Sequence, residues 1–141
     1  FWHKPDYLSG FFNIIYDSRD NTPDNGVLIW ATNTGEMRVW MPGSWVGDAI
    51  AYNAAPVGIW TFIRVTVKPT AFDIWVNGVL ATTVPRNPVP LTGSQINIAQ
   101  TVRSDLAGSH NYYHGSIFDF RQSMLDRTPY TVPTEPFPDH A

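Results

Sequence analysis

The sequence has no cysteine, little charge and no long run of apolar residues. Without cysteine, the chain cannot form disulfides, zinc–thiolate sites or iron–sulfur clusters, and it has no cysteine nucleophile. Its longest apolar run is far shorter than the roughly 20 residues that a membrane-spanning helix requires. We therefore expect no insertion into a membrane, and several classes of metalloprotein and redox protein are excluded.

The charged residues carry only a small negative excess. Nine Lys and Arg stand against twelve Asp and Glu, which gives a formal net charge of −3. A protein that binds nucleic acid generally needs a basic surface to meet the phosphates. We therefore expect no nucleic-acid partner.

Aromatic and loop-forming residues are abundant instead. Aromatic residues make up 14% of the 141 residues, six of them Trp, and there are 10 Gly and 12 Pro. The acids are ten Asp and only two Glu, and Asp favours turns whereas Glu favours helices. This composition indicates short β-strands joined by many turns.

Short segments of alternating or continuous apolar character predict β-strands. The Asn77-Gly78 pair between two of them is the strongest hairpin signal in the chain. About eight or nine such strands are typical of an all-β, two-sheet antiparallel β-sandwich. We predict one sandwich domain over 1–128 and an extended proline-rich tail or linker over 129–141. The predicted strands are 11–16, 27–32, 36–41, 60–68, 72–76, 79–84, 95–100 and 116–122.

Two tryptophans lie on the polar side of their predicted strands. Alternate side chains of a strand point to opposite sides, so Trp40 shares a side with Arg38, and Trp75 shares one with Asp73. A flat indole beside charged groups suits a sugar ring, because the indole meets the C–H face while the charges bond the hydroxyls. The alternative is structural: such a Trp also packs under a loop or fills a subunit interface.

The long loop over 42–58 supplies further candidates for ligand binding. It contains Trp45, Asp48, Tyr52 and Asn53, a mixture of aromatic and hydrogen-bonding side chains. Loops on a rigid sandwich commonly carry recognition residues. The alternative is that this loop packs on the core as a cover.

A polar turn near the N-terminus offers oxygen ligands for a metal. Asp17, Asp20 and Asp24 lie close together in the sequence and carry the hard oxygen donors that calcium prefers. Their spacing is not that of a known calcium loop, and Asp-rich turns are common without metal. Calcium is therefore a candidate ion, and the sequence indicates no required cofactor.

The sequence predicts no catalytic centre. It has no Gly-rich phosphate loop, no Gly-x-Ser-x-Gly motif and no His-Glu-x-x-His motif. Its only two Glu are Glu36 and Glu135, and Glu135 lies in the proline-rich tail, so a paired-Glu glycosidase is not expected. We therefore expect a protein that is not an enzyme.

Three stretches together carry a family resemblance. They are Trp-Thr-Phe-Ile-Arg-Val-Thr-Val at 60–67, Phe-Asp-Ile-Trp-Val-Asn-Gly-Val-Leu at 72–80 and Gly-Ser-Ile-Phe-Asp-Phe-Arg at 115–121, with Ile-Asn-Ile at 96–98 between the last two. In this order they resemble the laminin-G-like group of concanavalin A-like jelly rolls, and the resemblance extends over 26–127. The sugar-binding motifs of galectins and the catalytic strand of jelly-roll glucanases are absent.

The resemblance implies a recognition module that binds glycans or a protein surface, in some members with calcium at the rim of the sandwich. We expect a non-catalytic carbohydrate-binding or adhesion domain of a larger protein, on the cell exterior or the virion surface. The alternative is a structural or oligomerisation module of a viral or phage spike, fibre or capsid decoration. In that case the Trp residues would lie in contacts between copies of the chain, and the protein would be a homo-oligomer.

Overall fold

The computed structural model describes residues 1–20, 25–44, 47–93, 96–99 and 111–122. Within these ranges the chain forms strands and turns, and no helix is long and apolar enough to cross a membrane. The strands are β1 (Trp2–Tyr7), β2 (Asn13–Asp17), β3 (Leu28–Ala31), β4 (Met37–Trp40), β5 (Ala49–Ala51), β6 (Thr61–Val67), β7 (Ala71–Val76), β8 (Val79–Pro85), β9 (Asn97–Ile98), β10 (Asn111–Tyr112) and β11 (His114–Phe118).

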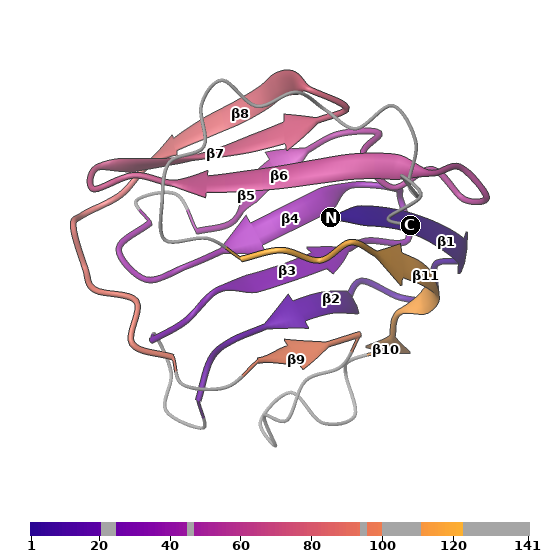
Figure 1. Cartoon of the computed structure of the whole chain (residues 1–141), viewed down its shortest axis with the longest axis horizontal. Helices are drawn as coiled ribbons and strands as arrows, with labels where there is room; N and C mark the ends of the chain where they lie inside the picture. Colours follow the sequence, from indigo (N-terminus) through magenta and orange to yellow (C-terminus); the bar gives the residue numbers. More distant parts are fainter. Residues whose placement is uncertain (21–24, 45–46, 94–95, 100–110, 123–141) are drawn as a thin grey trace, which may run out of the picture.

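The strands form two stacked sheets (Figure 1). One sheet has the order β11-β1-β6-β7-β8, and the other has the order β10-β2-β3-β4-β5, with β9 also paired to β2. Neighbouring strands are antiparallel throughout except for β10 and β2, which form a short parallel pair. The predicted two-sheet antiparallel sandwich is confirmed.

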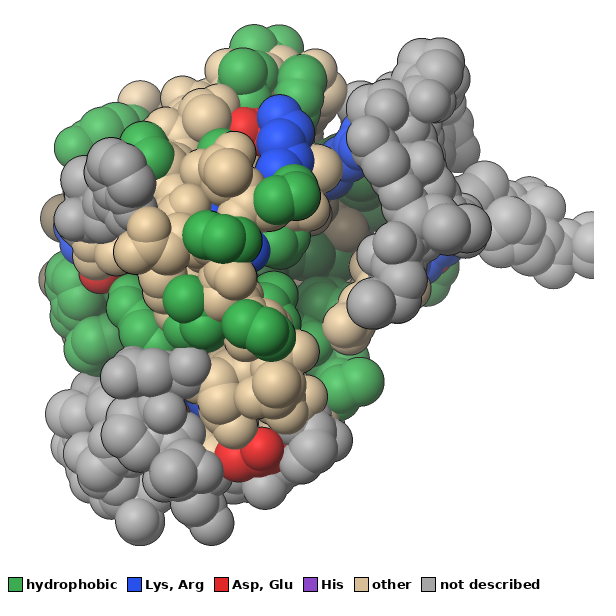
Figure 2. All heavy atoms as spheres, turned by 90° about the vertical axis from the view of Figure 1, so that its left-hand side faces the viewer, with side chains coloured by type: hydrophobic (Ala, Val, Ile, Leu, Met, Phe, Trp, Pro, Cys, Tyr) green, Lys and Arg blue, Asp and Glu red, His purple; other side chains and the backbone are tan. Residues whose placement is uncertain are grey.

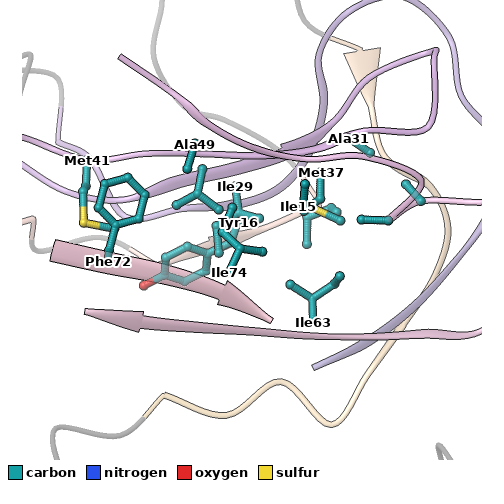
Figure 3. Packing of buried hydrophobic residues seen from close by; sticks show 14 of the residues in the cluster. Ile15, Tyr16, Ile29, Ala31, Met37, Met41, Ala49, Ile63, Phe72 and Ile74 are labelled. Atoms are coloured by element: carbon teal, nitrogen blue, oxygen red, sulfur yellow. The ribbon is translucent and has the colours of Figure 1, made fainter. Parts of the chain in front are cut away.

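The core fills the space between the sheets with the side chains on the apolar side of each strand. Met37 and Val39 of β4 and Phe72 and Ile74 of β7 are fully buried, in agreement with the alternation in the sequence. Figure 3 shows side chains of β2, β3 and β4 directed toward those of β6 and β7. Because the strand pleat sends every second side chain inward, this packing leaves the intervening side chains on the outer faces of the sheets.

The β7–β8 hairpin forms at the predicted turn. Asn77 and Gly78 both have positive φ, at 49° and 83°, which is the conformation that a two-residue hairpin turn favours. The Asn77 side chain also accepts a hydrogen bond from the backbone N–H of Phe62 at 2.8 Å. The turn therefore fixes β7 against both of its neighbours.

Arg86 anchors the segment that follows β8 along one end of the sandwich. Its buried guanidinium donates hydrogen bonds to the backbone carbonyls of Pro42, Lys68 and Val89. Figure 2 views this end, where hydrophobic side chains are spread between polar atoms and few charged side chains are visible. The segment is thus held by backbone acceptors rather than by an ion pair within the described residues.

β1 was missed from the sequence because one of its inward side chains is polar. His3 is fully buried, with Nδ1 3.0 Å from the Tyr113 hydroxyl and Nε2 3.0 Å from the Ala54 carbonyl oxygen. A carbonyl only accepts, so the neutral imidazole carries its proton on Nε2 and accepts the Tyr113 O–H at Nδ1. His3 therefore joins β1 to two distant loops in place of an apolar contact.

Burial lowers the pKa of His3 from its ordinary value of 6.5 to about 4, against the opposing effect of the Ala54 carbonyl. Between these values the unfolded chain binds a proton that the folded chain does not. We predict that the free energy of unfolding falls as the pH is lowered through this range, by up to about 1.4 kcal/mol per pH unit from His3 alone.

Urea unfolding followed by Trp fluorescence from pH 4 to pH 7 measures this dependence. The variant His3→Gln removes the titrating group, so the difference between the two proteins isolates His3 from the carboxylates and the other histidines. If the free energies of unfolding of wild type and variant change equally with pH, the prediction is wrong.

Candidate ligand-binding site

The outer side of the β2–β5 sheet carries a regular array of side chains. Ile14, Trp30, Arg38 and Ile50 are register partners across β2, β3, β4 and β5. One row further, Asp17 pairs with Leu28 and Leu28 pairs with Trp40. Continuing the β4–β5 ladder by one residue at each end places Asp48 opposite Trp40 and Tyr52 opposite Glu36. We call the β4–β5 part of this array the Trp40 face, and its residues are Glu36, Arg38, Trp40, Asp48, Ile50 and Tyr52.

The β2 and β3 part of this array is a second hydrophobic cluster. Ile14, Leu28 and Trp30 are buried although they point away from the main core, and Phe12 and Trp40 pack against them. The central strands β2 and β3 are therefore apolar on both sides. This cluster lies beside the Trp40 face on the same side of the sheet, and Trp40 packs against it.

Arg38 is held in one position at the centre of the face. Its Nη1 donates to Asp48 at 2.7 Å, and its Nη2 and Nε donate to Glu36 at 2.9 and 3.0 Å. The guanidinium carbon also lies 4.8 Å from the ring centroid of Phe11, a cation–π contact. Burial alone would lower the pKa of Arg38, but its hydrogen bonds to the carboxylates of Asp48 and Glu36 raise it, so the guanidinium stays charged.

Trp40 is half-buried and lies against the cation of a second ion pair. The guanidinium of Arg19 lies 5.9 Å from the Trp40 ring centroid and forms two bonds of 2.9 Å to the two carboxylate oxygens of Asp17. Both side chains of this pair are buried. The indole therefore rests on a fixed cation and leaves part of its surface to solvent.

Tyr52 and Asn53 follow β5 directly. Tyr52 is 69% exposed, and Asn53 is exposed with a positive φ of 54°, so it turns the chain away from the strand. An exposed phenol at one end of the face and a half-buried indole at the other end thus flank the fixed guanidinium. This arrangement offers apolar surfaces and hydrogen-bond donors to one ligand.

Residues 1–129 match a family model that is named for laminin G and described as the concanavalin A-like lectin/glucanases superfamily. This chain belongs to that superfamily. A search of curated proteins found no matching relative. Laminin G-like domains are generally non-catalytic and are often carbohydrate-binding or adhesive, although the superfamily also contains glucanases.

The laminin G-like sandwich separates the site residues predicted from the sequence. Trp40, Arg38, Asp48, Tyr52 and Asn53 come together at the Trp40 face and its edge. Trp75 and Asp73 lie on the outer side of the other sheet, where Trp75 contacts Arg64 and Asp73 bonds to Thr83 and Lys68. One ligand-binding surface therefore does not contain both tryptophans. Trp45 lies outside the described residues.

The acids predicted to bind calcium have protein partners. Asp17 gives both oxygens to Arg19, and Asp20 accepts a bond of 2.8 Å from Asn25. Asp24 lies outside the described residues. Across the described ranges, no three His, Asp or Glu side chains are grouped as metal ligands. A calcium ion at this turn stays a prediction, and Asp17 would have to share its carboxylate between the ion and Arg19 to bind it.

The sequence reasoning missed Phe11, Trp30, Arg19 and Glu36. Phe11 precedes β2 and reaches over Arg38, which no alternation pattern indicates. Glu36 could have been found, because it shares the parity of Arg38 and Trp40 in the predicted strand. Trp30 and Arg19 required the knowledge that β2, β3 and β4 are adjacent in one sheet.

We predict that Asp17→Asn lowers the free energy of unfolding by about 3 kcal/mol, because it leaves the buried charge of Arg19 without its partner. The loss should be equal in EDTA and in excess calcium chloride, measured by urea unfolding. Asp20→Asn, at a half-buried position, serves as the control. If calcium stabilises the wild type and not Asp17→Asn, then the Asp17 carboxylate binds the metal instead.

Proposed function

We propose that this laminin G-like domain is a non-catalytic carbohydrate-binding or adhesion module and that a glycan binds on the Trp40 face. The observation that supports it is the fixed guanidinium of Arg38 between two partly exposed aromatic rings. Trp40 and Tyr52 would pack against C–H faces of sugar rings. Within the described residues, three bonds occupy three of the five N–H donors of Arg38, which leaves two for sugar oxygens.

The length of the face favours an oligosaccharide. Tyr52 pairs with Glu36, which is four residues from Trp40 along β4, so the two rings are about 13 Å apart along the strand direction. A single sugar ring would contact one aromatic side chain and Arg38. A chain of several sugars would contact both rings at once, so affinity should rise with chain length.

The acids of the face support binding rather than hydrolysis. A glycosidase needs one carboxylic acid to protonate the leaving oxygen and a second carboxylate on the other side of the scissile bond. Glu36 and Asp48 both bond to the same guanidinium. Their shared role is to hold Arg38, and the contacts that the face offers require no metal ion.

The setting that fits such a face is the cell exterior or the virion surface, where glycans are displayed. We propose that the domain provides recognition for a larger protein. Its partner in that setting is a glycan, alone or as part of a cell-surface glycoprotein.

A glycan array identifies the ligand, and calorimetric titration with that ligand then tests the face. We predict that Trp40→Ala and Tyr52→Ala each weaken binding by about tenfold or more, because each removes one stacking surface. Trp75→Ala is the matched control, since Trp75 is also a half-buried sheet tryptophan but lies on the opposite face. It should bind as the wild type does.

Loss of binding in Trp75→Ala with retention in Trp40→Ala would move the site to the other sheet. If no glycan binds and the protein forms a stable oligomer in sedimentation analysis, this proposal is wrong and the alternative, a structural or oligomerisation module, is favoured.

A further inference from the structure

A buried hydrogen-bond donor on the strand next to the Trp40 face has no acceptor within the described residues. Trp30 is 3% exposed, and its indole N–H has no partner among the described residues. Leaving such a donor unpaired costs about 1–3 kcal/mol, and the great majority of buried polar groups in native proteins are paired. The indole N–H groups of Trp2 and Trp75 are also buried without a partner in the described part of the chain, but among these tryptophans Trp30 is the register neighbour of Arg38.

The residue that carries this donor is a neighbour of the centre of the proposed binding site. Trp30 and Arg38 are register partners on β3 and β4, and both side chains point to the same outer side of the sheet. The ring centroid of Phe11 is 6.4 Å from that of Trp30 and 4.8 Å from the guanidinium carbon of Arg38. Phe11 thus covers the junction between the two side chains.

Phe11 is a cover that can be displaced without moving the backbone. Its side chain is 44% exposed, and its contacts within the described residues are with the rings of Phe12 and Trp30 and the guanidinium of Arg38. The preceding residue is fixed, because the Gly10 carbonyl accepts hydrogen bonds from Asn33 at 3.0 Å and from Asn13 at 3.4 Å. Rotation of one exposed side chain is fast, on the picosecond-to-nanosecond scale, and here it would open a path to Trp30.

The chemistry of this place selects the kind of group that fits. The available groups are donors: the Trp30 N–H and the two remaining N–H groups of Arg38. The single positive charge of Arg38 is outweighed by the carboxylates of Glu36 and Asp48, so an anionic sugar would be repelled. The surrounding side chains are apolar, because Phe12 and Ile14 belong to or pack on the same cluster as Trp30.

A neutral acceptor with a small apolar group matches these conditions. An acetamido group has a strong carbonyl acceptor and a methyl group, and it carries no charge. We propose that Trp30 donates to the acetamido carbonyl of an uncharged N-acetylated sugar, whose methyl group packs against Phe11 and Phe12. This inference rests on the proposed function and names the sugar class that the Trp40 face selects.

The test uses two trisaccharides with the same linkage, the β-1,4 trimers of N-acetylglucosamine and of glucose, which differ in the acetamido group. Calorimetric titration of the wild type should show at least about tenfold tighter binding of the N-acetylated trimer, a difference of about 1.4 kcal/mol. Trp30→Phe keeps an aromatic ring and removes the N–H. It should reduce that preference toward parity, read as the ratio of the two affinities within the variant, whatever its effect on the affinity for the glucose trimer.

An NMR measurement on the wild type keeps the inference testable if Trp30→Phe does not fold. The indole proton of Trp30, assigned by triple-resonance experiments, should move downfield on saturation with the N-acetylated trimer as it gains an acceptor. The indole proton of Trp75 on the opposite face should not move.

The outcomes separate this inference from the proposed function. If Trp40→Ala abolishes binding of both trimers but the wild type shows no preference, the acetamido proposal is wrong and the glycan-binding face stands. If Trp40→Ala binds as the wild type does, the face itself is wrong. If neither trimer binds the wild type, the acetamido proposal is overturned, whereas glycan binding is judged by the array.

Discussion

The pleat of β4 sets the relation between the core and the candidate binding site. Met37 and Val39 are buried in the core between the sheets, and because alternate side chains of a strand point to opposite sides, Arg38 and Trp40 point outward. A shift of one residue in the pairing of β4 would exchange these sets and bury a charge pair in the apolar core. The same packing that stabilises the sandwich therefore specifies which side chains meet a ligand.

Electrostatic contacts then make the outer face rigid. Each of the two arginines is held by carboxylates and lies against an aromatic ring, Arg38 against Phe11 and Arg19 against Trp40. Side chains that are already fixed lose little conformational entropy on binding. A surface built in this way can discriminate ligands by the placement of a few hydrogen bonds rather than by closing around them.

Much of this was visible in the sequence. Alternation correctly predicted which side chains of β4 and β7 point inward and which point outward, and the Asn77-Gly78 turn predicted that β7 forms a hairpin with β8. Parity is defined relative to a strand's own sheet, however, so it did not reveal that Trp40 and Trp75 face opposite directions. β1 escaped prediction because His3 replaces an apolar core residue, and β5 because three residues are too short for a periodic pattern.

Phe120 joins the two sheets at the edge that holds β1, β2 and β11. Its ring stacks on Phe1, which precedes β1 of the five-stranded sheet, with centroids 5.3 Å apart, and on Tyr16 of β2 in the other sheet, with centroids 5.0 Å apart. Phe1 and Phe120 also pack against the buried core. The segment after β11 therefore closes this edge of the core with aromatic rings, so the two sheets are coupled there by side chains where no ladder of backbone hydrogen bonds joins them among the described residues.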